Sequence, residues 1–185
     1  MPAEKAALRR RFRAVRADAP AGASAAVVAR VLALPEVAAA RAVLAFWPLA
    51  GEIDVRPLID ALAARGVTVA LPAVVPGPAP RLAARAHVPG ALVAGRWGLM
   101  EPAAGAPPVP ALDVVVVPAL ALGRDGSRLG YGGGYYDAFL ATTDALRVGV
   151  VLHACLMDAL PAEPHDARLD VVVTERETAR ARHAG

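Results

Sequence analysis

Four consecutive valines at positions 114–117 constrain the fold of this chain more than any other feature of its sequence. β-Branched residues favour strands, and an uninterrupted apolar run suits a strand that is covered on both faces. Such coverage is typical of parallel α/β proteins, because their crossover connections place helices over the sheet. The run therefore predicts a central strand in a mainly parallel sheet.

Segments with alternating helical and strand patterns surround this run. We expect helices over residues 4–17, 24–34, 55–65 and 134–140, and strands over 42–47, 67–71, 146–152 and 169–173. In detail, Ser24 should cap the second helix, Pro72 should stop the second strand, and the tail from Thr174 should be peripheral. The strand–helix–strand order is typical of parallel βαβ units. The sequence predicts a three-layer α/β fold, with an open, mainly parallel sheet and helices on both faces.

The bulk properties narrow the domain organisation and the partners. A chain of 185 residues suits one domain, so we expect residues 1–185 to form a single unit with proline-rich loops at 76–80 and 102–110. The net charge of +3 is too small to indicate general nucleic-acid binding, and no apolar run reaches the roughly 18–20 residues that span a bilayer. With a single cysteine, no intrachain disulfide can form. We expect a cytoplasmic monomer without nucleic-acid or membrane partners; an arginine-rich transit peptide is the alternative interpretation of the start.

The segment Arg128-Leu-Gly-Tyr-Gly-Gly-Gly-Tyr-Tyr-Asp137 follows the valine strand and leads into a helix. Glycines let the backbone approach a ligand, and consecutive N–H groups at a helix start attract anions. Arg128 supplies a cation for phosphate, and Asp137 offers the oxygen ligands that Mg²⁺ prefers. The segment matches neither a Walker A loop nor the Rossmann fingerprint. The glycines alone therefore leave two interpretations open, a phosphate site and a glycine-rich surface turn.

The same segment resembles the signature of the 5-formyltetrahydrofolate cyclo-ligase family, and further motifs of that family occur in the same order. They are Lys5-Ala-Ala-Leu-Arg9, Glu52-Ile-Asp54 with Pro57-Leu58, Leu71-Pro72, Trp97-Gly-Leu-Met-Glu101-Pro102, and Leu160-Pro-Ala-Glu163-Pro-His165-Asp166 with Asp170 and Thr174-Glu175. The resemblance covers nearly the whole chain, and several motifs in order are hard to obtain by chance. It implies a fold of the NagB/RpiA/CoA-transferase-like kind.

The resemblance also implies a reaction. Members of the family use ATP and Mg²⁺ to convert 5-formyltetrahydrofolate, with or without a polyglutamate tail, into 5,10-methenyltetrahydrofolate, ADP and phosphate. Phosphorylation of the formyl oxygen turns it into a good leaving group, and N10 of the folate then attacks the activated carbon. Such a site mainly positions the reactants and neutralises phosphate charge.

Carried over to this sequence, the resemblance implies roles for four sets of residues. Catalytic roles fall on Lys5, Arg128 and Tyr135. The implied ATP contacts are Lys5, Arg9, Arg128, Gly130, Gly132, Gly133, Gly134, Tyr135 and Tyr136. The implied folate contacts are Trp47, Glu52, Trp97 and Tyr131, and the implied magnesium ligands are Asp137 and Asp170.

Departures from the family's pattern keep other functions open. The chain has Ala-Leu-Ala-Leu-Gly at 119–123 where the family usually has Gly-Leu-Ala-Phe-Asp, lacks the common aromatic residue near Leu152, and has Cys155 in place of a glutamine. The alternatives are a divergent ATP-binding paralogue with another substrate, a sugar-phosphate or acyl-CoA enzyme, and a non-catalytic nucleotide-binding protein. His165-Asp166 could be a metal or acid–base pair, but we favour a role in shaping a loop. We expect Cys155 to be a buried small residue.

Overall fold

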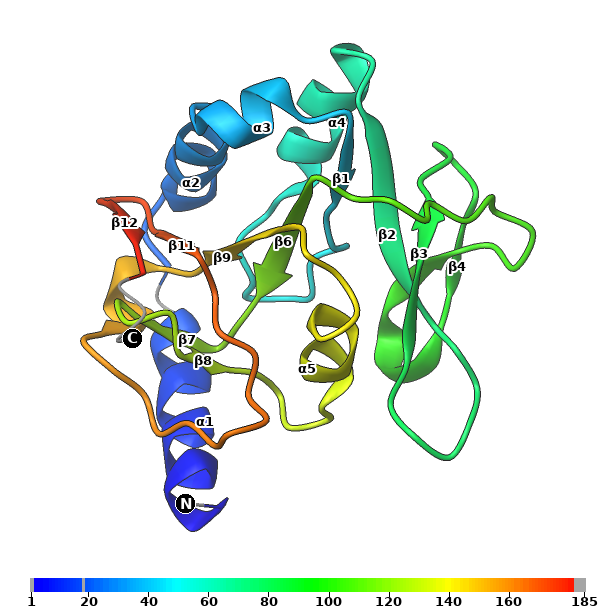
Figure 1. Ribbon diagram of the computed structural model, residues 1–185. Helices are drawn as coiled ribbons and strands as arrows, with labels where there is room; N and C mark the ends of the chain where they lie inside the picture. Colours follow the sequence, from blue (N-terminus) through cyan, green and yellow to red (C-terminus); the bar gives the residue numbers. More distant parts are fainter. Residues whose placement is uncertain (1, 18, 182–185) are drawn as a thin grey trace.

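A seven-stranded sheet forms the centre of the computed structural model, which describes residues 2–17 and 19–181 (Figure 1). Its strand order is β12-β11-β9-β6-β1-β2-β3. The inner strands β1 (Ala42–Leu44), β2 (Thr68–Val74), β6 (Val114–Pro118), β9 (Leu146–Val150) and β11 (Val171–Val173) are parallel. The edge strands β3 (Leu82–Ala86) and β12 (Thr178–Arg180) run antiparallel to their neighbours. The predicted open, mainly parallel sheet is confirmed.

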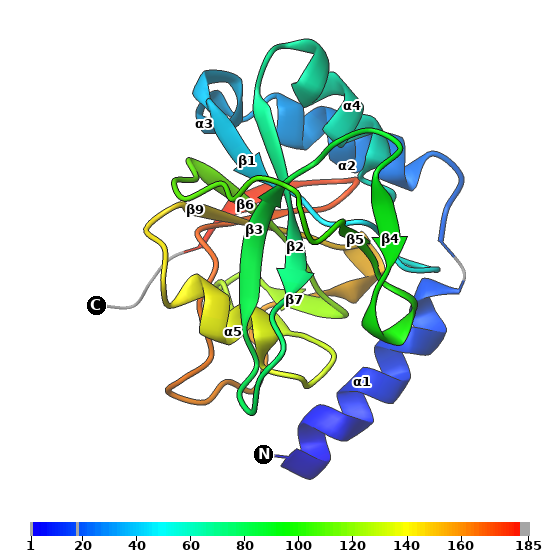
Figure 2. The ribbon, with the colours of Figure 1, turned by 90° about the vertical axis from the view of Figure 1, so that its right-hand side faces the viewer.

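Helices lie on two opposite sides of this sheet (Figures 1 and 2). On one side are α2 (Ala23–Leu32), α3 (Pro35–Ala39) and α4 (Arg56–Ala64); on the other are α1 (Pro2–Arg16) and α5 (Tyr135–Leu140). Two small sheets complete the fold: β10 (Leu156–Met157) with β7 (Ala121–Gly123) and β8 (Arg128–Leu129), and the hairpin of β4 (Leu92–Ala94) and β5 (Met100–Pro102). The 3₁₀ turn η1 (Arg96–Gly98) connects β4 to β5, and a second 3₁₀ turn, η2 (His153–Cys155), lies between β9 and β10.

The valine run occupies the most protected place in the sheet. All four valines of β6 are fully buried, and β6 pairs in parallel with β1 on one side and β9 on the other. Burying one such side chain stabilises the fold by about 1.5–3 kcal/mol. The prediction that this run forms a central strand covered on both faces is confirmed.

Several predicted element boundaries are wrong, each for a local reason. The strand β2 continues through Pro72 to Val74; β1 stops pairing with it at Ala70, so the missing N–H of Pro72 breaks no bond on that side. Gly22 precedes α2 as its cap, while Ser24 Oγ accepts a hydrogen bond from the backbone of Asp54. Beyond α2 the chain forms the short α3 instead of ending its helix at Leu34.

The tail from Thr174 is also not peripheral. Thr174 is fully buried, and β12 pairs with β11 to extend the sheet at that edge. The side chains of β12 alternate between exposed and half-buried positions. The charged residues of the tail obscure this strand pattern in the sequence. No helix in residues 2–17 and 19–181 is long and apolar enough to cross a membrane.

Candidate active site

A cavity of about 620 Å³ lies where the parallel strands end. Its wall includes the residues that follow β1 and the carboxyl ends of β2 and β6, the usual place for a ligand in an open parallel sheet. We call one part the strand half, formed by Phe46, Trp47, Leu49, Glu52, Pro72, Val74, Leu82, Leu99, Met100, Glu101 and Pro118. The other part is the loop half, formed by Arg128, residues 130–134, Tyr135, Tyr136 and Asp137, with Arg13 of α1 at its edge.

The loop half is built around the glycine-rich connection between β8 and α5. Gly132 and Gly134 have φ angles of 101° and 70°, a left-handed conformation that favours glycine. The backbone N–H groups of residues 131–134 donate no hydrogen bond to any group in the described chain. Successive unbonded N–H groups in such a turn form an anion-binding concavity. The loop is therefore suited to phosphate, one of the two interpretations that the sequence leaves open.

Arg128 and Asp137 give the loop half its charges. Arg128 Nη2 lies 2.7 Å from Asp137 Oδ1, and the arginine side chain is only 6% exposed. Arg128 Nε is buried and has no hydrogen-bond partner in the described chain. Asp137 Oδ1 also accepts a hydrogen bond from Ala167 N, whereas Oδ2 accepts none from described residues. The loop half thus combines a cation with an unused donor and a carboxylate with an unused oxygen.

The guanidinium of Arg128 depends on a glycine for its position. A Cβ atom added to Gly130 would lie 2.6 Å from Arg128 Nη1, so the side chain packs directly on the glycine backbone. The same guanidinium lies 5.8 Å from the ring centre of Tyr136, whose hydroxyl is buried without a partner in the described chain. Burial raises the pKa of Tyr136 far above its ordinary value, so its hydroxyl stays neutral.

Glu52 is the acidic residue that faces the loop half from the strand half. Its side chain is 5% exposed; Oε2 accepts a hydrogen bond from Leu49 N at 2.9 Å, and Oε1 accepts one from the Tyr131 hydroxyl. Burial and the neighbouring Glu52 charge raise the pKa of Tyr131 to about 12, so this hydroxyl remains a donor at neutral pH. A carboxylate has about four acceptor positions, so Glu52 can still accept hydrogen bonds from a ligand. Trp47 adds an aromatic surface to the same wall.

Helix α1 contacts the site from outside. Arg9 Nε donates to Gly130 O at 2.9 Å, and its guanidinium lies beside Gly132, where an added Cβ would come within 3.3 Å of Arg9 Cζ. Lys5 is 7% exposed and does not line the cavity. Its Nζ lies 2.6 Å from Asp166 Oδ2 and 3.0 Å from Glu163 Oε2. Burial lowers the pKa of Lys5, but the hydrogen bonds to both acids outweigh burial and raise the pKa above its ordinary value.

Glu163, His165 and Asp166 are the only group of three potential metal ligands within the described chain. Lys5 already contacts both acids, while the His165 side chain is 75% exposed and 3.7 Å from Glu163 Oε2. Asp166 Oδ2 also accepts a hydrogen bond from Glu163 N at 2.7 Å, which closes the local turn. These contacts support the predicted role of this segment in shaping a loop.

Lys5, Arg9 and Asp170 are predicted site residues that do not line the cavity. Asp170 stands at the amino-terminal end of β11, where its Oδ2 accepts a hydrogen bond from Arg147 N at 2.8 Å. The cavity lies at the carboxyl ends of the parallel strands, and Asp170 does not line it, unlike Asp137. Pairing of these two acids around magnesium therefore gains no support from the cavity and stays a prediction. Trp97 belongs to η1, and its side chain lies outside the described residues.

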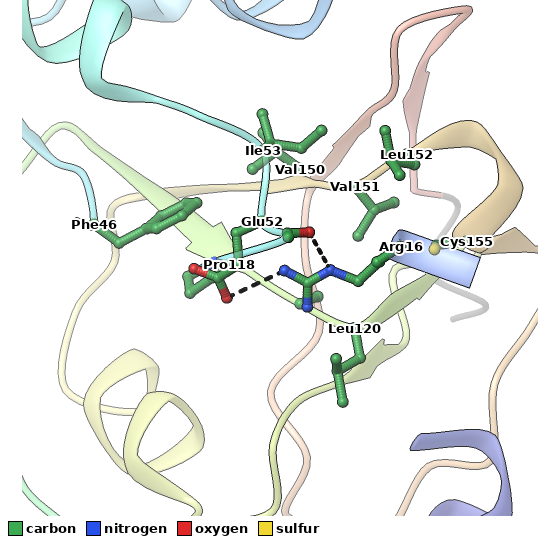
Figure 3. Close-up of a pocket in the computed structure, with 12 residues that line it drawn as sticks. Arg16, Phe46, Glu52, Ile53, Pro118, Leu120, Val150, Val151, Leu152 and Cys155 are labelled. Atoms are coloured by element: carbon green, nitrogen blue, oxygen red, sulfur yellow. Dashed lines mark hydrogen bonds and ion pairs between the residues drawn. The ribbon is translucent and has the colours of Figure 1, made fainter. Parts of the chain in front are cut away.

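Sequence reasoning missed Arg16 and Glu101. Arg16, which is 8% exposed, lies beside Glu52 behind the strand half (Figure 3). It also donates hydrogen bonds to Gly51 O and the Tyr131 hydroxyl. Glu101 Oε2 accepts a hydrogen bond from Val74 N at 2.9 Å and so ties the β4–β5 hairpin to β2. The signal for Arg16 was present, since Lys5, Arg9 and Arg16 recur at intervals of four and seven and so share one helix face.

The departures from the family's pattern lie away from the large cavity. Residues 119–123, Leu152 and Cys155 are buried, and none of them lines it. Four of these residues line a second cavity of about 10 Å³ beside Arg16: Ala119, Leu120, Leu152 and Cys155. Cys155 is fully buried, which confirms the expectation of a buried small residue, and burial raises the pKa of its thiol to about 11.

Comparisons with known proteins identify the family of the chain. A sequence model of the 5-formyltetrahydrofolate cyclo-ligase family matches residues 2–175. The chain is 39% identical over 147 residues to the 5-formyltetrahydrofolate cyclo-ligase of Mycolicibacterium smegmatis, with 74% of each protein covered. It is 36% identical over 152 residues to the Escherichia coli protein of that name, covering 78% of this chain and 84% of the relative.

Two solved structures share the fold. The NMR structure of Aquifex aeolicus 5,10-methenyltetrahydrofolate synthetase superposes with a TM-score of 0.82 at 29% identity, covering 98% of this chain and 94% of that one. A 5,10-methenyltetrahydrofolate synthetase from Mycoplasma pneumoniae gives a TM-score of 0.73 at 19% identity, covering 93% of this chain and 99% of that one. The second likeness concerns the fold alone.

Proposed function

The chain belongs to the 5-formyltetrahydrofolate cyclo-ligase family, and from this membership we propose that its large cavity carries out the ATP-dependent conversion of 5-formyltetrahydrofolate to 5,10-methenyltetrahydrofolate. One observation carries the assignment to this cavity. Unbonded loop amides with Arg128 lie on one side, and Glu52 with Trp47 lies on the other. A triphosphate and a flat ring with N–H donors need these two different surfaces. The volume of about 620 Å³ also suits small-molecule ligands.

ATP phosphates bind, in this proposal, against the loop half. The N–H groups of residues 131–134 supply neutral donors, and the guanidinium of Arg128, which lines the same surface, adds charge-assisted hydrogen bonding. Arg9 supports the loop through Gly130 O, while Tyr135 and Tyr136 line the same surface. Lys5 stays a predicted phosphate contact, which would require its ammonium to exchange Glu163 and Asp166 for phosphate oxygens.

Asp137 is the residue that best suits magnesium. Its Oδ2 is a hard oxygen ligand without a partner among described residues, and it stands beside the proposed phosphate surface. Magnesium at this place would offset phosphate charge during transfer. The resemblance adds Asp170 as a second ligand, and that addition rests on the resemblance alone.

The folate ring binds, in this proposal, against the strand half. Glu52 accepts hydrogen bonds from ring N–H groups, and Trp47 and Tyr131 offer aromatic faces to the ring systems. Trp97 remains a folate contact implied by the resemblance. This arrangement sets the formyl group of the substrate beside the loop half.

The chemistry follows from the weakness of formamide oxygen as a leaving group. The γ-phosphoryl group moves from the β-phosphate oxygen of ATP to the formyl oxygen, and ADP leaves. Folate N10 then forms a bond to the formyl carbon and loses its proton, and the oxygen departs with the phosphate. Arg128 neutralises charge on the transferred group, and the two halves hold the reacting atoms in place. Catalytic roles for Lys5 and Tyr135 rest on the resemblance.

The proposal includes the organisation of the protein. One continuous cluster of buried side chains joins the helices to the central sheet, which supports residues 1–185 as a single domain. We expect a monomer that acts on reduced folate with or without a polyglutamate tail. Sedimentation velocity would check the monomer, and affinities for folates with one and several glutamates would show which tail is preferred.

The test mixes purified protein with 5-formyltetrahydrofolate, ATP and magnesium. The product absorbs in the near ultraviolet, so we expect an absorbance increase that matches the ADP and phosphate released in a 1:1:1 ratio. Omitting ATP or chelating magnesium should abolish the increase. ATP binding without any absorbance change would contradict the proposal and favour a non-catalytic nucleotide-binding protein.

A further inference from the structure

Arg16 is a buried arginine that lines the small cavity of about 10 Å³ (Figure 3). It does not line the large cavity, but it contacts Glu52 of the strand half and Tyr131 of the loop half. It stands at the carboxyl-terminal end of α1 and is 8% exposed. Burying a charged group costs free energy unless partners compensate for the lost water. The identity of its partners therefore indicates what this arginine is for.

The partners of Arg16 are the groups that orient Glu52. Arg16 Nε donates to Gly51 O at 2.6 Å, Nη1 donates to the Tyr131 hydroxyl at 2.8 Å, and Nη2 lies 3.7 Å from Glu52 Oε1. A tyrosine hydroxyl has a single proton to donate. Arg16 Nη1 donates to the Tyr131 oxygen, so this oxygen is the acceptor in that bond. The single proton of the tyrosine hydroxyl is then donated to Glu52 Oε1.

This arrangement fixes one carboxylate from three sides. Tyr131 holds Oε1, Leu49 N holds Oε2, and the arginine charge compensates the charge of the buried acid. Tyr131 belongs to the glycine-rich loop, whereas Glu52 belongs to the segment between β1 and α4. Arg16 thereby joins a loop-half residue to a strand-half residue.

We propose that Arg16 is a positioning residue for folate recognition, which holds Glu52 oriented through the Tyr131 hydroxyl and the Gly51 carbonyl. It touches neither the substrate nor the reacting atoms. The inference rests on the function proposed above, because it assigns Glu52 to the folate ring. It predicts that loss of Arg16 weakens folate binding more than ATP binding.

The surroundings of Arg16 explain why arginine is needed there. The planar guanidinium donates from Nε and Nη1 in a fixed fork, which a lysine ammonium cannot reproduce. Nη2 has no hydrogen-bond partner in the described chain, and the adjoining cavity of about 10 Å³ has room for about one water molecule. A smaller polar side chain can therefore replace Arg16 without a clash, although it does not reproduce the fork.

The experiment measures 5-formyltetrahydrofolate affinity by titration calorimetry without ATP, and ATP affinity separately. Arg16→Gln should weaken folate binding about 10-fold to 30-fold, as expected for loss of a charged hydrogen-bonding group, with ATP affinity within about 2-fold. Arg16→Lys keeps the charge and loses the planar fork of donors, so its folate affinity should lie between those of the wild type and Arg16→Gln. Arg10→Gln is the matched control, because it removes the same charge from an exposed position on the same helix; its affinities should equal those of the wild type.

A double-mutant cycle separates positioning from a general structural role. If Arg16 acts through Glu52, Arg16→Gln combined with Glu52→Gln should bind folate no more weakly than Glu52→Gln alone. Additive losses would overturn the inference. Steady-state kinetics should show a raised KM for folate with a smaller change in kcat.

A further variant covers failure of Arg16→Gln to fold. Tyr131→Phe removes the same link and leaves the buried arginine in place, and it should weaken folate binding about 3-fold to 10-fold. Unchanged folate affinity in a folded Arg16→Gln or in Tyr131→Phe would overturn the inference while wild-type turnover leaves the proposed function intact. A wild-type protein that binds no 5-formyltetrahydrofolate would overturn both.

Discussion

The loop half and the strand half of the cavity recognise ligands by different means. The loop half offers the unbonded amides of residues 131–134 and the charged pair of Arg128 and Asp137. The strand half offers apolar and aromatic side chains and two carboxylates, Glu101, which is bonded to Val74 N, and Glu52, whose two oxygens are both oriented by protein donors. The first surface suits distributed negative charge, and the second suits a flat ring with a few N–H groups.

Helix α1 supports both the loop half and the strand half, through different residues. Arg9 holds the loop half through Gly130 O, and Arg16 reaches the strand half through Glu52 and Gly51. The two halves should therefore respond separately to changes inside them, even though α1 supports both. The following variants test that separation.

The largest effect is expected from Arg128→Ala. The variant removes the cation that β8 contributes to the loop half, and it leaves Asp137 without its ion pair. ATP affinity should fall about 100-fold, with folate affinity within about 2-fold, because charged hydrogen bonds contribute most to phosphate binding. Titration calorimetry with each ligand alone measures both values. Unchanged ATP affinity would remove the loop half from the phosphate site.

Glu52→Gln should produce the opposite selectivity. It keeps the shape of the side chain and removes the charge that accepts from ring N–H groups, so folate affinity should fall about 30-fold. ATP affinity should be unchanged. The same calorimetric titrations apply, and a variant that loses ATP and folate affinity equally would show that the halves are not separate.

Gly130→Ala tests the packing of Arg128 on the loop. The added Cβ would lie 2.6 Å from Arg128 Nη1, so the end of this flexible side chain must move. ATP affinity should fall about 5-fold to 10-fold with little change in Tm, since a displaced guanidinium loses part of its charged hydrogen bonding. Gly77→Ala is the control, because a Cβ there meets no atom within 4 Å. Equal affinities in both variants would refute the dependence on Gly130.

Asp166→Asn should have the smallest effect on ligand binding, because it concerns a contact outside both halves. Burial raises the pKa of Asp166, but the hydrogen bonds from Lys5 and from the Glu163 backbone, together with the Lys5 and His165 charges, outweigh burial and leave the pKa below its ordinary value. The folded pKa lies below the unfolded value of about 3.9, so this stabilisation is present above about pH 4 and is lost as pH falls through the folded pKa. For Lys5, whose pKa is raised, the stabilisation is present below about pH 10 and is lost above the folded pKa.

Urea unfolding at two pH values checks this expectation. Asp166→Asn should lower the free energy of unfolding by about 1–2 kcal/mol at pH 7, between the values for exposed and buried pairs. The difference from wild type should narrow below about pH 4. An equal difference at both pH values would contradict the ion-pair account, and an added loss of ATP affinity would assign Lys5 to the loop half.

The two halves also differ in how far the sequence could predict them. The loop half comes from ten consecutive residues, so its glycines, Arg128 and Asp137 were visible together. The strand half brings together residues from separate strands and loops, and contacts such as Tyr131 with Glu52 arise only on folding. The strand β6 was predictable because four valines leave little alternative, whereas β4 and β5 are three-residue strands without a clear alternation. Arg16 was hidden among other arginines, although its spacing from Arg9 carried the signal.

The most direct test of the two-surface account is an NMR titration of the backbone amides and tryptophan side chains with each ligand alone. An ADP–magnesium complex should shift the amides of residues 131–134 and leave the Trp47 indole N–H unchanged. The ligand 5-formyltetrahydrofolate should shift the Trp47 indole and the Glu52 amide, with small changes at Gly132 and Gly133. If both ligands shift the same set of signals, or if the nucleotide leaves residues 131–134 unchanged, the account is contradicted.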